Sequence, residues 1–143
     1  MNLPIVTIYT DGSCRDGMGG WAAVLRYYNQ QLNICGSDIN TTNNRMEISA
    51  VINALSRLNT KCEVHLYSDS KYVLDGLNWC HNWSKNNWRT TTGPVLNLDL
   101  WQVLFQLASE HKIHKHWVKG HNGDEYNEAC DTLAKYARDF QIK

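Results

Sequence analysis

The sequence has no excess of charge of one sign and no long apolar run, and its cysteines form no CxxC pair. Fourteen Lys and Arg balance fourteen Asp and Glu. This balance excludes a polycation that coats nucleic acid, but not a localised nucleic-acid site. The longest apolar run covers only residues 21–25, far short of a membrane span. The N-terminus lacks the basic and apolar regions of a signal peptide. We therefore expect a soluble, cytoplasmic protein that does not bind membranes.

The five cysteines are odd in number and widely spaced, which indicates neither a disulfide framework nor a zinc site. We expect them to be reduced thiols. The length of 143 residues, with 43% hydrophobic and 20% charged residues, is typical of one globular domain. No linker, repeat or low-complexity tract divides the chain, so the prediction is a single domain over residues 1–143.

The residue pattern changes from strand-like to helical along the chain. β-branched and aromatic residues predict strands over 5–10, 20–28 and 31–39, with a turn at Asp11-Gly12 after the first. Apolar residues at helical spacing predict a helix from Met46, with Thr42 or Asn43 as its N-cap. A strand at 64–67 is followed by Ser68-Asp69-Ser70 and then by a helical stretch that ends at Leu77. A helix at 99–110, a strand at 113–118 and a helix at 125–138 complete the order. The apolar face predicted for the helix at 99–110 consists of Leu100, Val103, Leu104 and Leu107. This order indicates an α/β fold with a mixed sheet flanked by helices.

Carboxylates lie where ligands collect in α/β sheets. Asp11 ends the first predicted strand, Asp69 follows the fourth, and Glu47 lies near the start of the first long helix. Asp131 lies among apolar residues of the last helix, where burial would require a partner. At ~4 Å each pair of such acids would repel by about 4 kcal/mol, which a hard cation with oxygen ligands, Mg²⁺ or Mn²⁺, relieves. Taken singly, each acid is better explained as a solvated turn residue or a residue near a helix cap than as a metal ligand.

The residues around these acids are more specific than their positions. In chain order the motifs are YTDGSC at 9–14, TTNNRME at 41–47, SDSKYV at 68–73, WVKGH at 117–121 and NEACD at 127–131. Together they resemble the motifs of type 1 ribonuclease H of the bacterial kind, over residues 5–138. One TDGS motif is weak evidence, whereas five motifs in the family's order are strong evidence.

The resemblance implies a ribonuclease H-like fold, a five-stranded mixed β-sheet flanked by helices. It also implies hydrolysis of the RNA strand of RNA–DNA hybrids, leaving 5′-phosphate and 3′-hydroxyl ends. The family's acids match Asp11, Glu47, Asp69 and Asp131, which would hold two Mg²⁺ ions, with Mn²⁺ as a substitute. One ion would activate the attacking water and the other would stabilise the departing 3′-oxygen. His121 matches a family histidine that assists proton transfer or product release. The histidines at 65, 81, 111, 114 and 116 match no catalytic motif and are expected to be structural or surface residues.

One segment has the composition of a nucleic-acid surface. Residues 79–98 contain no acid, and cations alternate there with aromatic residues: Trp79, Trp83, Lys85, Trp88 and Arg89. This segment resembles the family's basic protrusion, which holds the DNA strand, although two positive charges are fewer than well-known bacterial members carry. Packing of the tryptophans in the core is the alternative interpretation.

Other expected substrate contacts come from the resemblance alone. Cys14, Asn43 and Asn44 match residues near the RNA strand, and Thr42 matches a residue of a DNA-phosphate pocket. Two departures predict weaker contacts. The glycine-rich turn at 15–20 lacks the family's Asn-Pro-Gly element, and Asn40 stands where some relatives have Arg.

Three alternative functions are weighed against a stand-alone hybrid nuclease. A resolvase or transposase core shares the fold but lacks the TNNRME and KGH motifs. A hybrid-binding module without catalysis would not require all four acids and His121. A domain of a reverse-transcriptase polyprotein is disfavoured by Met1 and by the intact protrusion. We expect a monomer that binds RNA–DNA hybrid duplex and has no protein partner.

Overall fold

The computed structural model describes residues 2–120 and 123–142, and over these ranges the chain forms a mixed sheet with helices on both faces. The strands of the main sheet are β1 (Ile5–Arg15), β2 (Met18–Tyr27), β3 (Gln30–Asp38), β4 (Glu63–Ser68) and β7 (Lys112–Trp117). The helices are α1 (Asn43–Leu55), α2 (Lys71–Lys85), α3 (Leu98–Ala108) and α4 (Glu125–Phe140). A small separate hairpin consists of β5 (Arg89–Thr90) and β6 (Gly93–Pro94). The predicted α/β class with a five-stranded mixed sheet is confirmed.

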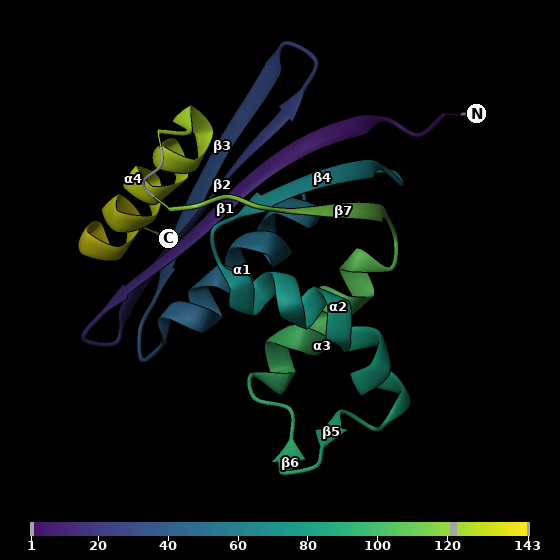
Figure 1. The fold of residues 1–143 in the computed structure, drawn as a ribbon. Helices are drawn as coiled ribbons and strands as arrows, with labels where there is room; N and C mark the ends of the chain where they lie inside the picture. The colour runs from purple at the N-terminus through teal and green to yellow at the C-terminus, as the bar shows by residue number, and fades with distance from the viewer. Residues whose placement is uncertain (1, 121–122, 143) are drawn as a thin grey trace.

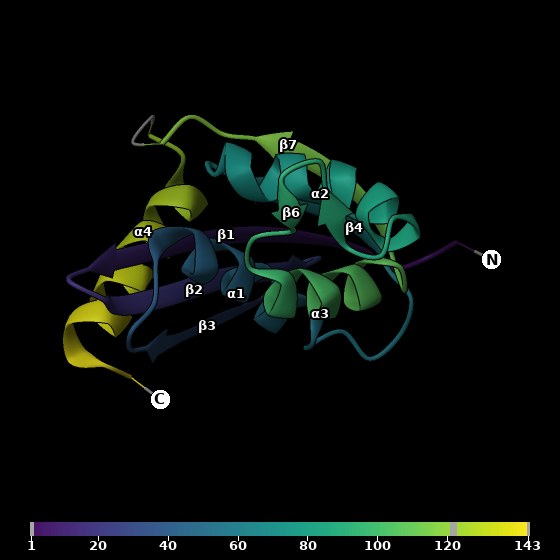
Figure 2. The same ribbon diagram turned by 90° about the horizontal axis from the view of Figure 1, so that it is seen from below.

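The strand order is β3-β2-β1-β4-β7. The β1–β2 and β2–β3 pairs are antiparallel, whereas β1–β4 and β4–β7 are parallel. Parallel pairs require crossover connections, and the chain supplies them as α1 before β4 and as α2 and α3 before β7. Figure 1 shows α4 against one face of the sheet and α1, α2 and α3 on the other. In Figure 2 the sheet is seen from the side of α1 and α3.

The first strand is longer than predicted, and the prediction of a turn at Asp11-Gly12 is wrong. Both residues lie inside β1, where they pair with Ala22 and Trp21 of β2. The chain turns instead at Asp16-Gly17, where both φ angles are positive, 52° and 78°, as tight hairpin turns require. An Asp-Gly dipeptide therefore predicts a turn only where its residues do not pair with a neighbouring β-strand.

Gly12 is required by the close packing of α1 rather than by a turn. A Cβ atom at this position would lie 2.5 Å from the backbone nitrogen of Glu47 and 2.6 Å from the carbonyl carbon of Met46. No side chain fits in that space, so the absence of one lets the first turn of α1 lie directly against β1. The same contact brings Glu47 next to Asp11.

The core lies between the sheet and the α1–α3 layer. Trp101 and Leu104 of α3 are fully buried there, whereas Val103, predicted on the apolar face, is 47% exposed. Trp101 sets this orientation, because its ring packs against Gly76 of α2 where any Cβ would collide with it. Helix α2 also continues beyond the predicted end at residue 77, to Lys85. None of the helices in the described ranges has both the length and the apolar character needed to cross a membrane.

Candidate active site

Three of the four predicted acids meet at one point of the fold. Asp11 comes from the middle of β1, Glu47 from the first turns of α1, and Asp69 from the residue after β4. One carboxylate oxygen from each lies within 4.8 Å of one from each of the others. Asp11 and Glu47 are 4% and 5% exposed, and Asp69 is partly buried. The structure therefore gathers acids separated by up to 58 positions in the sequence.

Local structure fixes the position of each acid. Thr42 is the N-cap of α1, and its hydroxyl accepts a hydrogen bond from the Arg45 backbone N–H at 3.2 Å, which sets where Glu47 lies. The backbone N–H of Gly12 donates to Asp11 Oδ1 at 2.9 Å. Asp69 lies between the end of β4 and Ser70, whose hydroxyl caps α2 by accepting from the Val73 N–H. Of the two predicted N-caps, Thr42 and Asn43, the structure shows Thr42.

The acids perturb one another strongly. Burial, followed by the charges of Asp69 and Asp131, raises the pKa of Asp11 to about 8. Burial and the charges of Asp11 and Asp69 raise the pKa of Glu47 well above its usual range. Within the described part of the chain, Glu47 Oε1 is buried and has no hydrogen-bond partner. These observations fit a hard divalent cation, which would supply the missing partner and offset the repulsion.

Asp131 lies beside this group rather than within it. Its oxygens are not among those gathered within 4.8 Å, although its charge contributes to the raised pKa of Asp11. Its side chain is 25% exposed and forms an ion pair of 3.1 Å with Lys135, one turn further along α4. The neighbouring Cys130 thiol donates to the carbonyl of Tyr9 at 3.2 Å, which ties this turn of α4 to β1. The partner required by a partly buried Asp131 is therefore Lys135.

The predicted His121 lies outside the described residues, but the residue before it approaches the acids. A Cβ atom on Gly120 would lie 3.1 Å from Asp69 Oδ2. The glycine thus lets the backbone of the loop pass close to this carboxylate. The motif around residues 119–123 could have indicated this contact, since glycine is the residue that permits close backbone approach.

The residues expected to contact the RNA strand border the acid cluster. Asn43 and Asn44 are exposed in the first turn of α1, next to the capping residue Thr42. The Cys14 thiol lies near the end of β1 and donates to the Thr41 carbonyl at 3.5 Å. This hydrogen bond links the end of β1 to the residue before the N-cap of α1. The expected roles of these side chains in substrate binding stay predictions.

The structure separates the five residues predicted for the protrusion into two groups. Trp83 and Trp88 pack against the core, with Trp83 edge-on to Trp101 and Trp88 edge-on to Phe105. These two rings anchor the end of α2 and the following segment to α3. The other three residues are exposed and available to a ligand: Trp79, Lys85 and Arg89. In Figure 1 the β5–β6 hairpin extends from this region, beyond α2 and α3.

A five-stranded mixed sheet with carboxylates gathered between β1, α1 and β4 defines the class of nucleases with a ribonuclease H-like fold. The sequence model of the family described as RNase H matches residues 4–139. The chain therefore belongs to the RNase H family, whose members are metal-dependent endoribonucleases.

Relatives in sequence and structure agree with this assignment. A protein named Ribonuclease H from Rhizobium johnstonii is 51% identical over 134 residues, covering 91% of this chain and 89% of the relative. Another of that name, from Chromohalobacter salexigens, is 49% identical over 142 residues, covering 96% of this chain and 87% of the relative. The crystal structure of "LC9-RNase H1, a type 1 RNase H with the type 2 active-site motif" superposes with a TM-score of 0.89. That protein is 32% identical, and the match covers 99% of this chain and 75% of the other.

Proposed function

We propose that this chain hydrolyses the RNA strand of RNA–DNA hybrids at the site formed by Asp11, Glu47 and Asp69. The observation that carries the proposal is the convergence of three carboxylates from separate elements on one buried point. Such a cluster is costly without a cation, because burial and like charges raise the pKa values of its acids. Membership of the RNase H family supports the reaction and the substrate.

The donor set fits Mg²⁺, since among residues 2–120 and 123–142 the ligand atoms gathered in the cluster are all carboxylate oxygens. We infer that two ions are held by Asp11, Glu47, Asp69 and Asp131, and that Mn²⁺ is a possible substitute. When bound, such ions supply Lewis-acid stabilisation of the phosphodiester oxygens and a more acidic water, consistent with 5′-phosphate and 3′-hydroxyl products.

Within the cluster, the chain holds its acids in fixed positions. The Gly12 N–H donates to the Asp11 carboxylate, and the close contact of α1 with β1 keeps Glu47 buried, at 5% exposure. Preorganised ligands of this kind need not rearrange during the reaction. The ion pair with Lys135 holds Asp131 at the edge of the cluster, where rotation of its side chain brings it into use. We assign His121 to proton transfer or product release.

The remaining predicted residues are proposed to position the hybrid. Lys85 and Arg89 supply positive charge for DNA phosphates, and the exposed ring of Trp79 offers a stacking surface. Near the acids, three side chains are proposed to contact the RNA strand that is cut: Cys14, Asn43 and Asn44. Thr42 is proposed to contact a phosphate of the DNA strand. Trp83 and Trp88 act indirectly, by anchoring the protrusion to the core. We infer a monomer that acts on hybrid in the cytoplasm.

The first experiment measures cleavage of an end-labelled RNA–DNA hybrid with and without Mg²⁺, beside RNA–RNA and DNA–DNA duplexes. We expect metal-dependent cleavage of the RNA strand of the hybrid alone, and products that can be extended from a 3′-hydroxyl. Asp11→Asn is expected to lose this cleavage. The matched control is Asp75→Asn, the same change at an exposed position of α2. Binding without cleavage under both Mg²⁺ and Mn²⁺ would instead show a hybrid-binding module with structural acids.

A further inference from the structure

A group of imidazole and carboxylate side chains lies on the sheet away from the acid cluster. Glu63 and His65 are two positions apart on β4 and so share one face. His114 of β7 is the register partner of His65. The stacking of Tyr67 on Tyr9, which in turn contacts Tyr126, places this face on the α4 side of the sheet. Helix α4 packs on β1, β2 and β3, so the β4–β7 part of that face remains accessible to ions.

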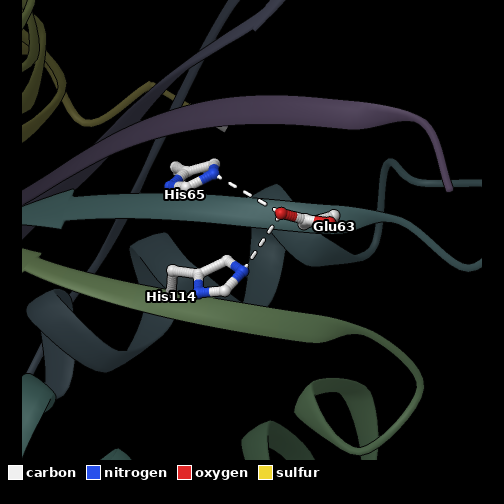
Figure 3. A group of neighbouring side chains, drawn as sticks. All are labelled: Glu63, His65 and His114. Atoms are coloured by element: carbon white, nitrogen blue, oxygen red, sulfur yellow. Dashed lines mark hydrogen bonds and ion pairs between the residues drawn. The ribbon is translucent and has the colours of Figure 1, made fainter. Parts of the chain in front are cut away.

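The three side chains converge on a common point (Figure 3). Glu63 Oε2 lies 3.2 Å from His114 Nε2 and 3.8 Å from His65 Nε2. Ligand atoms around a tetrahedral Zn²⁺ ion are about 3.3 Å apart, so the side chains already have close to the spacing that a metal requires. The two rings are stacked, with centroids 4.7 Å apart. His114 Nε2 donates a hydrogen bond to Glu63 Oε2, and a bound ion would take the place of that proton, which moves to Nδ1 or to solvent. The side chains are 28–37% exposed, so either ring can tilt toward the ion.

A fourth residue orients the ring of His65. His65 Nδ1 lies 2.9 Å from His116 Nε2, in hydrogen-bond contact across the two strands. With His65 as donor, the proton is on Nδ1 and the lone pair is on Nε2, the nitrogen that faces Glu63. Metal-binding histidines are commonly oriented by such a hydrogen bond from the second ring nitrogen. His116 is itself held in place by stacking on Tyr67, with centroids 4.5 Å apart.

We propose that Glu63, His65 and His114 form a second metal site, which takes a borderline transition-metal dication such as Zn²⁺ and is oriented by His116. Two imidazoles and one carboxylate are a donor set typical of Zn²⁺ and its neighbours and unsuited to Mg²⁺. Three protein ligands leave a position for water. A bound ion would also link β4 to the edge strand β7. This proposal goes beyond the expectation that His65, His114 and His116 are structural or surface residues.

The second site is independent of the acid cluster. Asp69 lies four residues beyond His65 along β4, about 13 Å at the rise of an extended strand. The two sites also differ in donor chemistry, oxygen alone in one and mainly nitrogen in the other. Saturating Mg²⁺ therefore occupies the acids without competing for the imidazoles.

The test is a Zn²⁺ titration of the full chain, without a histidine tag and in excess Mg²⁺. Binding is measured by calorimetry or by competition with a chromophoric chelator. We expect one equivalent of Zn²⁺ to bind. His65→Gln, His114→Gln and Glu63→Gln are each expected to lower the affinity at least tenfold, and His116→Phe by about 10–100-fold. The matched control is His81→Gln, which makes the same change at an exposed position of α2 and leaves binding unchanged.

Two further measurements identify the ligands and the fold of the variants. Circular dichroism of each variant verifies folding, and the absorption of the Co²⁺-loaded protein separates nitrogen and oxygen ligands from thiolates. Asp11→Asn, which removes an acid of the proposed nuclease site, is expected to retain Zn²⁺ binding, so failure of one proposal is distinguishable from failure of the other. No stoichiometric binding in the wild type, a thiolate charge-transfer band, or full affinity in folded His65→Gln and His114→Gln would overturn the second site.

Discussion

Replacing Asp69 by asparagine removes one of three gathered carboxylates with almost no change in shape. The ligand oxygens of Asp11 and Asp69 lie within 4.8 Å of each other. Two unit charges at that separation repel by about 3 kcal/mol at an effective dielectric constant near 20. Asp69→Asn is therefore expected to stabilise the metal-free protein, and to abolish cleavage in the presence of Mg²⁺.

The gain in stability should depend on pH with a definite sign. The pKa of Asp11 is about 8 in the folded protein, mainly because of burial and then because of Asp69 and Asp131. Its ordinary value is 3.8, so between these two values the folded state holds a proton that the unfolded state has released. The stability that this proton contributes to the folded state is fully present below pH 3.8 and is lost as the pH rises through about 8. Asp69→Asn lowers the pKa of Asp11, so we expect a small gain at pH 6 and the full gain, about 3 kcal/mol, near pH 9.

Urea unfolding in EDTA at pH 6 and pH 9 measures this difference. The control is Asp75→Asn, the same change at an exposed position, for which we expect a change within about 0.5 kcal/mol at both pH values. Mg²⁺ should stabilise the wild type more than Asp69→Asn, because the variant has lost a ligand. The electrostatic reasoning is refuted if Asp69→Asn is no more stable than the wild type at pH 9, or if its advantage shrinks as the pH rises.

Four further variants test the packing and the substrate surface. Gly12→Ala should cost about 3 kcal/mol or more in urea unfolding, since its Cβ collides with the backbone of α1; a loss below 1 kcal/mol would mean that α1 shifts easily. Trp83→Ala should destabilise the fold by about 2–3 kcal/mol, whereas Trp79→Ala should leave stability within about 0.5 kcal/mol and raise KM for the hybrid. Equal stability losses for both would contradict their assignment to core and surface. Replacing both Lys85 and Arg89 by alanine should raise KM and reduce the slope of log KM against log salt by about 1–2, and an unchanged slope would remove the protrusion from DNA binding.

Much of the site is predictable from local sequence. The motifs identify Asp11, Glu47 and Asp69, and the hydroxyl of Thr42 ahead of an amphipathic run places Glu47 near the start of a helix. The position of Asp69 after a strand follows from the apolar run that precedes it. Such signals are reliable because they depend on hydrogen bonds and periodicity within a few residues.

The turn assignment shows where local patterns fail. Asp11-Gly12 and Asp16-Gly17 carry the same turn signal, yet only the second is a turn. The difference lies in residues distant in sequence, because β2 pairs with the first dipeptide and α1 packs against Gly12. The tryptophans are a second example, because residue type does not distinguish Trp79 from Trp83. Only the position of α3 leaves Trp79 exposed and buries part of Trp83.

By itself the sequence predicted the order of the main helices and strands, the mixed α/β class and the three acids that the fold brings together. The tertiary structure alone decided that Asp131 of α4 lies close enough to Asp11 of β1 to raise its pKa, and that Glu63, His65 and His114 meet at the other end of β4. The physical reason is register. Local propensity makes a strand, but which residues face each other on β4 and β7 depends on pairing across some 50 residues of intervening chain, and that pairing is set by the packed core.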